Sequence, residues 1–589
     1  MAVLTIQEWK DRIRNGQRFM SKFAQSNNWS RYKEYYRHRG FKDGIIPVNL
    51  VFSILRSMVP QVYFRNPRVT ITARKPGLEA DLNARLVQHI DNWLLTQMSV
   101  KREIKRMIQD NFFCGIGIGL HGYDSQFGYS PDLIDPAGGY SLSQFDSKGN
   151  RTEYNSTIGP GMPWFLRARP EDVVFPWGST DKESLEWFAL RVFRPLDDLK
   201  ADKKYTNTTE LVGTVNKRRT MPEGGVIIDI TDQLSQADDD TKWVELWEIH
   251  DVKTGTVKAL TMDFDAWLRD EPDDLQVEGG LPIDVVTFNP DPDYIYGVPD
   301  ARIIEPQLLE LNDIRTQAMK HRRINIIKAL VREGALSDEE MQKLKSEDVQ
   351  AFVIVKDDTM NIGGAVVPLN PGVSGILQDL IAQGEVAQGD IRETVGFSRV
   401  AQGQYQGKTH VSAAETNNVF KSLNIRLDER RDQIADLIES IVRNANKRIF
   451  KYWNQERVSK IMGPDGAQWW IKYTGAQLKD EYDLDVIAEE GTPMDKQTKL
   501  QLGQDASRVW AELNQGLIKQ GVPVPAEIQR LIFSQFDDTG LDIDRLLAQT
   551  QAMHQQGQAA MAQGGTNSTS LQNPASPAQA AQMLQERQR

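Results

Sequence analysis

The clearest pattern of hydrophobic and polar positions lies between about Val411 and Trp453. Apolar residues there recur at steps of three, four and once seven, which is the period of an amphipathic α-helix. Neither Pro nor Gly interrupts the pattern before its end, so the stretch predicts one helix about 60 Å long at 1.5 Å per residue. A helix of that length needs a large structure to pack against. The stripe consists of Phe420, Leu423, Leu427, Ile434, Ile438, Ile441, Ala445 and Ile449.

Two shorter helices precede it, predicted at 301–323 and 374–395. The first ends in a basic cluster that includes Lys320, Arg322 and Arg323, and Pro306 is expected in its first turn. Its apolar stripe consists of Ile304, Leu308, Leu311, Ile314 and Ala318. Between the two helices lies an insert whose ends are strand-like at Ile327–Val331 and Ala351–Val355, with a capping-box pattern from Ser337 to Glu340. This order predicts a small α+β module held away from the main body by a helix pair.

The rest of the chain mixes both patterns, so the fold class predicted is α+β. Helices are expected over 78–114, followed by a glycine-containing strand near Gly117, and alternation predicts a hairpin at Trp243–Ile249 and Val257–Met262. Further strands are expected at 469–473 and 482–488 and amphipathic helices within 496–549. Residues 550–589 are rich in Gln and Ala, and we expect a disordered tail there.

Composition fits a globular protein, since 40% of the 589 residues are hydrophobic and 26% are charged. No run of about 18 apolar residues occurs, and the first residues lack the apolar segment of a signal peptide, so we expect no membrane partner and assembly in a cytoplasm. The single cysteine, Cys114, excludes an internal disulfide framework and a zinc site made of several cysteines.

Charge is segregated along the chain. The net charge is −11, but residues 1–75 hold fifteen Lys and Arg against four Asp and Glu, which leaves about −22 for the remainder. Basic residues between Arg12 and Arg39 alternate with aromatic ones, as on a nucleic-acid surface. The alternative, which we favour, is a helix pair whose basic face is solvated or meets acidic surface elsewhere in an assembly.

Candidate chemistry is sparse. GQYQGKT at 403–409 is one residue short of a Walker loop, and no buried strand precedes it. Asp291 and Asp293 stand in an Asn-Pro-Asp-Pro-Asp turn, and the seven histidines are scattered, so we expect neither a metal nor a cofactor. No nucleophile motif is present, and nothing in the sequence indicates an enzyme.

Taken in order, these parts resemble the portal proteins of tailed bacteriophages. The likeness covers about residues 45–500 and is carried by VNLVFSILRSMVPQVYFRNP (48–67), FFCGIGIGLHGYD (112–124), RPEDVVFPWGS (169–179), FNPDPDYIYGVPDARIIEPQLLELNDIRTQAMKHRR (288–323) and GFSRVAQGQYQGKTHVSAAE (396–415). It implies a ring, commonly of about twelve subunits, at one capsid vertex, through which double-stranded DNA is packaged and ejected. It also implies a place in the virion.

The resemblance assigns a part of the portal to each stretch of the chain. The parts are wing (1–300), first stem helix (301–323), clip (324–373), second stem helix (374–395), tunnel loop (396–410), long wing helix (411–453), wing strands (454–495), crown helices (496–549) and tail (550–589). The residues expected to act are Arg399, Gln402, Gln404, Gln406 and Lys408 in the tunnel loop, Lys320, Arg322 and Arg323 on the stem, and Glu339, Glu340, Lys343 and Lys345 in the clip.

The partners implied are copies of the same chain, DNA, the terminase large subunit, tail adaptors, and the major capsid and scaffolding proteins. Two other interpretations stay open. A capsid or scaffold component that forms no ring would share the acidic, helical composition. A packaging ATPase would need a Walker loop and an acidic Mg²⁺ ligand, and the sequence offers neither in recognisable form.

Overall fold

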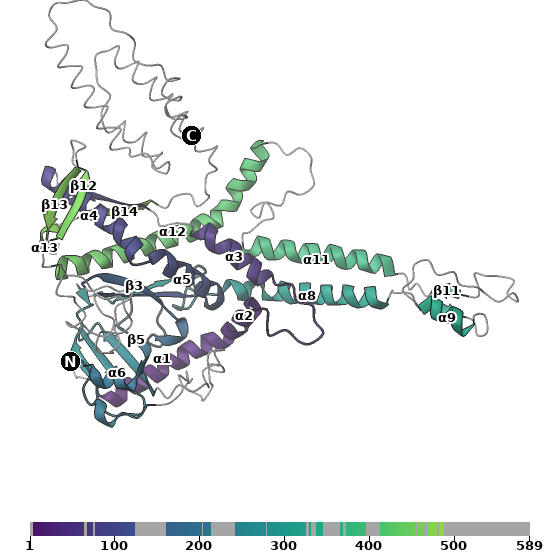
Figure 1. The fold of residues 1–589 in the computed structure, drawn as a ribbon, viewed down its shortest axis with the longest axis horizontal. Coiled ribbons are helices and arrows are strands. Elements are labelled where there is room, and N and C mark those ends of the chain that lie inside the picture. The colour runs from purple at the N-terminus through teal and green to yellow at the C-terminus, as the bar shows by residue number, and fades with distance from the viewer. Residues whose placement is uncertain are drawn as a thin grey trace, which may run out of the picture. The chain divides into compact units, whose positions relative to one another are not determined.

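The fold mixes helices and antiparallel sheets, as the α+β prediction required (Figure 1). The structure is a computed structural model, and it divides into two compact units, residues 1–456 with 473–492 and residues 457–472 with 493–589. It describes residues 4–63, 68–74, 77–123, 161–202, 204–213, 242–277, 280–324, 329–331, 337–345, 366–368, 373–395, 413–453, 457–462, 468–479 and 482–487.

The first unit begins with two basic helices, α1 (Ile6–Ser26) and α2 (Trp29–Tyr36). Thr5 starts α1 through a capping box, since its hydroxyl accepts from the Glu8 amide and the Glu8 carboxylate accepts from the Thr5 amide at 2.7 Å. Most aromatic side chains of these helices, among them Phe19, Trp29, Tyr32 and Tyr35, are buried. They therefore form protein core and are not displayed for stacking on bases.

A five-stranded antiparallel sheet lies next to α1. Its strand order follows the chain and α1 packs against β4. The predicted hairpin is confirmed as β6 and β7, joined by a turn at Gly255, whose φ of +61° suits glycine. The strands are β4 (Val173–Val174), β5 (Trp187–Pro195), β6 (Trp243–Asp251), β7 (Thr256–Leu260) and β8 (Arg269–Pro272).

A second sheet has the order β3-β2-β9. The glycine-containing strand is confirmed as β2 (Gly117–Tyr123), between β3 (Pro163–Ala168) and β9 (Ile283–Val286). Its glycines allow aromatic rings to lie flat on the strand, since a Cβ at Gly119 would come within 2.2 Å of the Phe165 ring. Around it are α3 (Leu50–Val62), α4 (Leu78–Gln97), α5 (Val100–Cys114), and β1 (Arg68–Ala73) paired with β14 (Tyr482–Ile487).

Three long helices complete the first unit (Figure 1). They are α8 (Asp300–Ile324), α11 (Val373–Val395) and α12 (Ala413–Tyr452), close to the ranges expected from the sequence. Pro306, expected in the first turn of α8, lies farther inside, because the helix already begins at Asp300. The long helix α12 packs on β2, β3, β9, α3, α4 and α13 (Gly475–Leu478), which is the large support that its length requires.

Between α8 and α11 the described elements are β10 (Ala329–Val331), α9 (Asp338–Lys345) and β11 (Val366–Pro368). β10 pairs with β11, a strand that the sequence pattern did not indicate, while the strand expected at Ala351–Val355 lies outside the described residues. The second unit contains the paired strands β12 (Arg457–Met462) and β13 (Gln468–Tyr473). The expected crown helices and tail, 496–589, lie outside the described residues.

Candidate channel stem

The helix pair α8 and α11 is held together by apolar stripes. On α8 the buried residues are Ile304, Leu308, Leu311 and Ile314, four of the five in the predicted stripe. On α11 they recur every three or four residues as Leu380, Gly384, Ala387, Ile391 and Val395. Gly384 lies at the contact, where an added Cβ would be 3.6 Å from Ile314 Cγ2. We call this pair the stem.

A buried ion pair fixes the root of the stem. Arg430 of α12 donates to Asp300 Oδ1 at 2.8 Å, and both side chains are buried. Asn289 donates to the same oxygen at 3.0 Å, and the Arg430 guanidinium lies 5.3 Å from the centre of the Phe288 ring. A carboxylate at the start of α8 also suits the positive end of the helix dipole. The long helix and the stem are therefore joined at a defined point.

The N-terminal segment packs along one side of α8. Glu305 accepts from Tyr32 at 2.9 Å and lies 3.2 Å from Arg31 in an ion pair. Farther along α8, Asn312 and Thr316 accept from the backbone amides of Val48 and Ile46 at 2.7 and 2.9 Å. Desolvation and the neighbouring Glu305 raise the pKa of Tyr32, which keeps its hydroxyl a donor.

A second polar cluster ties α12 to the three-stranded sheet. Asp284 of β9 accepts from Ser440 at 2.6 Å and also pairs with Lys182 and His121. Burial alone would raise the pKa of Asp284, but His121 and Lys182 hold it below its ordinary value. The ionised carboxylate therefore has a partner on each side, and the position of α12 on the sheet is fixed.

The outward surface of the stem differs from these anchored parts. Large apolar side chains are exposed on both helices, and their exposed fractions are 36% for Ile303, 40% for Leu309, 56% for Ile381 and 62% for Val386. Exposed apolar groups that gather on one helix pair are typical of a surface that another protein covers.

Some expected site residues can be placed. Lys320 and Arg322 are exposed near the C-terminal end of α8, where cations suit the helix dipole. Glu339 is exposed on α9, whereas Glu340 is 9% exposed and holds Lys343 at 2.8 Å. The tunnel-loop residues Arg399, Gln402, Gln404, Gln406 and Lys408 and the side chains of Arg323 and Lys345 lie outside the described part.

Sequence reasoning missed the residues that anchor the stem. Neither Arg430 nor Asp300 was among the residues expected to act. One signal could have indicated this contact, because Arg430 lies close to the apolar stripe of a long helix. An arginine in such a place often forms an ion pair with another element.

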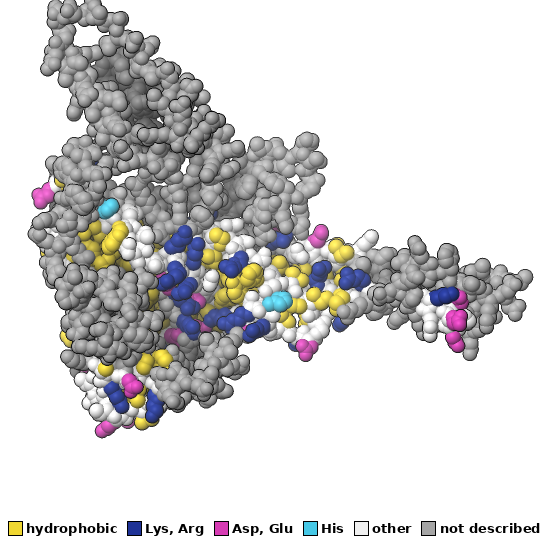
Figure 2. Space-filling model, viewed as in Figure 1, with side chains coloured by type: hydrophobic (Ala, Val, Ile, Leu, Met, Phe, Trp, Pro, Cys, Tyr) yellow, Lys and Arg dark blue, Asp and Glu magenta, His cyan; other side chains and the backbone are white. Residues whose placement is uncertain are grey.

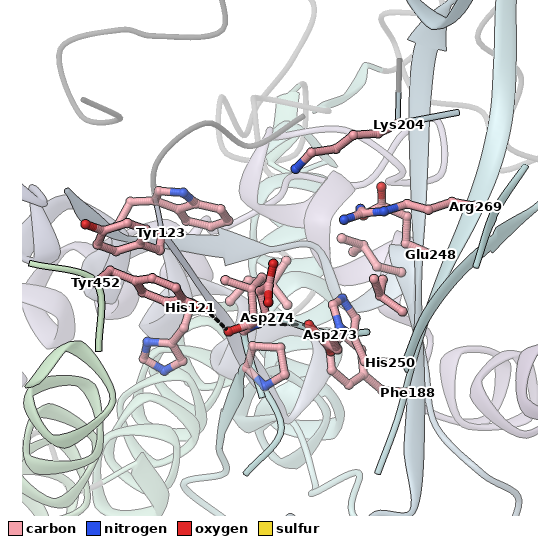
Figure 3. A pocket seen from close by; sticks show the side chains of 16 residues that line it. His121, Tyr123, Phe188, Lys204, Glu248, His250, Arg269, Asp273, Asp274 and Tyr452 are labelled. Carbon is pink, nitrogen blue, oxygen red and sulfur yellow. Dashed lines mark hydrogen bonds and ion pairs between the residues drawn. The ribbon is translucent and has the colours of Figure 1, made fainter. Parts of the chain in front are cut away.

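A small polar pocket in the first unit is lined by residues of both the five-stranded and the three-stranded sheet (Figure 3). Its volume is about 220 Å³. Tyr123 stacks on Tyr452 at 4.6 Å on one side, and Lys204 and Arg269 lie on the other. His250 contacts Asp273 at 2.6 Å at its base, and no group of acidic, His or Cys residues in the described part of the chain is arranged to hold a metal ion. Two of the pocket's acids have partners within the protein, Asp273 through His250 and Glu248 through Tyr205.

Comparison with known families shows to which family the chain belongs. The family model of the phage P22-like portal protein matches residues 172–589, which include the stem, α12 and their anchors. The chain belongs to this family. Portal proteins are structural components of the phage head that assemble with copies of themselves, and the family is not an enzyme family. A search among curated proteins found no match. Among the described residues of this portal protein, no helix is long and apolar enough to cross a membrane.

The family match begins after the N-terminal helices of the portal protein. Those helices nevertheless contact the matched region through Tyr32 and Glu305, and Lys33 pairs with Glu171 directly before that region. Lys10 likewise pairs with Asp265, so basic residues of α1 and α2 meet acidic residues of the same chain.

Proposed function

We propose that this portal protein forms a closed ring at one vertex of the capsid, commonly of about twelve copies, through which double-stranded DNA enters and leaves. The observation that supports it best is the stem. Its two helices pack on each other through one face each, yet Ile381 and Val386 remain more than half exposed. Copies arranged in a ring would cover such residues, and a head-to-tail contact that closes gives a ring.

The parts of the ring follow the helices. Residues 301–323 and 374–395 form the stem, 324–373 the clip, 396–410 the tunnel loop and 411–453 the long wing helix. Residues 1–300 and 454–495 form the wing, 496–549 the crown and 550–589 the tail. The root contact of Arg430 with Asp300 supports this division, because it connects the long wing helix directly to the stem.

DNA must slide through the ring, and weak contacts suit sliding. We propose that Arg399 and Lys408 touch phosphates and that Gln402, Gln404 and Gln406 offer neutral, exchangeable hydrogen bonds. Net charge supports this proposal, since an acidic chain repels phosphates over most of its surface. The basic end of α8, with Lys320, Arg322 and Arg323, would lie beside the clip.

The clip would receive first the terminase large subunit and later the tail adaptors, while the wing and crown face the capsid and scaffolding proteins. For this docking, Glu339, which is exposed, and Lys345 are the residues proposed to contact partners. Glu340 and Lys343 hold each other at 2.8 Å, so we assign them to the shape of α9 as well as to the docking rim.

The test is the assembly state of the purified full chain, which has a mass of 66.8 kDa. We expect mass photometry to show a species many times heavier and negative-stain images to show closed annular particles. A compact monomer under every assembly condition, including the presence of capsid and scaffolding proteins, would overturn the proposal.

A separate test addresses the tunnel loop. Arg399→Ala with Lys408→Ala should leave ring formation intact and impair DNA packaging or retention in phage particles. Unchanged packaging and retention would refute the role of these two residues without affecting the ring.

A further inference from the structure

A band of basic side chains covers three helices that pack on one another, α2, α3 and α5. Figure 2 shows Lys and Arg side chains gathered over this part of the molecule, with hydrophobic side chains between them. The exposed members, which we call the basic band, are Arg31, Arg37, Arg56, Lys101, Arg102 and Arg106.

The basic band carries more positive charge than its own carboxylates neutralise. Arg31 pairs with Glu305 at 3.2 Å and Arg37 with Glu34 at 2.6 Å, while buried Glu103 serves both Arg102 at 2.7 Å and Arg106 at 3.4 Å. Lys105 lies beside these residues, and desolvation together with the neighbouring Lys101 lowers its pKa. Arg56 forms no ion pair within the described part of the chain and lies over the Phe52 ring at 5.5 Å. The band therefore attracts an acidic partner.

The chemistry of the basic band favours a protein partner over DNA. Phe52, which stacks on Tyr36 and lies under Arg56, is 43% exposed. Arginine next to an exposed aromatic ring is typical of the core of a protein interface, where Arg and aromatic residues are enriched. A surface that contacts only phosphates binds them through cations and polar donors, and an exposed phenyl ring contributes nothing to that binding.

The α11 helix presents the opposite charge. Asp379, Val386, Asp390 and Glu393 are spaced by seven, four and three residues, so they form one line along the helix, which we call the acidic stripe. The line lies away from the buried stripe of Leu380, Ala387 and Ile391 that packs on α8. Asp390 forms no ion pair among the described residues, and an added Cβ at neighbouring Gly389 would meet nothing within 4 Å.

Both surfaces thus combine exposed apolar residues with unbalanced charge of opposite sign. We propose that the acidic stripe of one copy packs against the basic band of the next copy, with Val386 near Phe52. This inference rests on the proposed ring and identifies which surfaces meet in it. The two surfaces are different parts of the same chain, so the contact is head-to-tail and passes from copy to copy until the ring closes.

Charge reversal tests the pairing. Asp379→Lys with Asp390→Lys, and separately Arg56→Glu with Lys101→Glu, should each reduce ring assembly at least about tenfold, because each places like charges opposite each other. The chain that carries all four changes should recover rings. Glu183→Lys with Asp263→Lys, which reverses two exposed acids in the wing, is the matched control and should assemble normally.

Assembly is measured by mass photometry and negative stain, and folding of each variant by circular dichroism. Wild-type rings with no loss in either charge-reversal variant would overturn the pairing and leave the ring standing. An absence of wild-type rings would instead overturn the proposed function. Rings that persist in the Arg56→Glu, Lys101→Glu variant while binding of a fluorescent DNA duplex is lost would assign the basic band to DNA and overturn the inference.

Engineered cysteines give a measurement that does not depend on charge. Phe52→Cys together with Val386→Cys should produce disulfide-linked oligomers under oxidising conditions, while neither single variant should, and buried Cys114 should not contribute. A double variant that forms rings but no cross-links would contradict the proposed contact.

Discussion

The two sheets of the first unit with the residues beside them, which we call the wing sheets, and the stem differ in how their charged residues are paired. In the wing sheets, Arg191 is buried and lies 3.2 Å from Asp172, and His250 lies 2.6 Å from Asp273. On the stem, Glu385 and Asp390 are exposed and form no ion pair among the described residues, and apolar Val386 lies between them in the sequence. These charges of the wing sheets have partners within one copy, whereas Glu385 and Asp390 of the stem have no ion-pair partner among the described residues. The root of the stem, where Arg430 meets Asp300, marks the boundary between the two.

Removing Arg430 should have the largest effect on the single chain. Arg430→Met leaves Asp300 buried without its cation, and we expect a loss of about 3 to 5 kcal/mol in the free energy of unfolding of the first unit. Chemical denaturation followed by tryptophan fluorescence measures it. Arg443→Met, on the same helix but 62% exposed beside Glu439, is the control and should cost less than about 0.5 kcal/mol. Equal effects of the two changes would contradict the anchored root.

The next largest effect on stability is expected from the buried carboxyl group of Asp91. Asp91 of α4 accepts from Asn446 at 2.9 Å, and burial raises its pKa to about 8 from 3.8. The folded protein thus holds a proton that the unfolded chain releases above about pH 4. This contribution to stability is complete at low pH and is lost as the pH rises toward about 8.

Asp91→Asn removes this titration and keeps the shape of the side chain. The stability of the wild-type protein relative to this variant should therefore fall by about 1.4 kcal/mol per pH unit between about pH 5 and 7. Unfolding measured across that range checks it. A difference that does not change with pH would show that Asp91 is ionised in the folded protein.

The contact between the N-terminal helices and the stem should contribute less. Tyr32→Phe removes the hydrogen bond to Glu305 and leaves the ring packing, so we expect a loss of about 1 kcal/mol. The fluorescence-detected denaturation used for Arg430 measures it. Tyr294→Phe, with a side chain 41% exposed, is the control and should be nearly neutral. A neutral Tyr32→Phe would mean that this contact does not hold the helices on α8.

The smallest effect on a single copy belongs to the stem surface. Val386→Ser changes a side chain that is 62% exposed, so the stability of a separated copy should change by less than about 0.5 kcal/mol. Ring assembly should weaken clearly, because the apolar contact between copies is lost. A change in the free energy of unfolding without any change in ring assembly would contradict this account, because Val386 would then matter within one copy and not between copies.

The sequence indicated the helices well because their apolar stripes are long and regular. Ile304, Leu308, Leu311 and Ile314 were predicted from spacing and are buried. Strand β11 escaped because three residues, Val366–Pro368, are too few to show a period. The aromatic residues of α1 and α2 were compatible with a nucleic-acid surface and with a packed helix pair. Only the structure, in which Phe19 and Trp29 are buried, shows that these two residues belong to the core.

The site was less accessible from sequence. Arg430 and Asp300 are 130 residues apart, and no local pattern tells which charged residue of an amphipathic helix will find a buried partner. The basic band was missed for the same reason, since α3 and α5 supply four of its six members and only the fold brings these helices beside α2.

Hydroxyl-radical footprinting of separated copies and of assembled rings tests the central contrast most directly. We predict that Val386, Ile381 and Phe52 react in the separated copy and are protected in the ring, while buried wing residues such as Trp247 are protected in both. Equal reactivity of Val386 in the two states would show that the stem surface is not completed by a neighbouring copy.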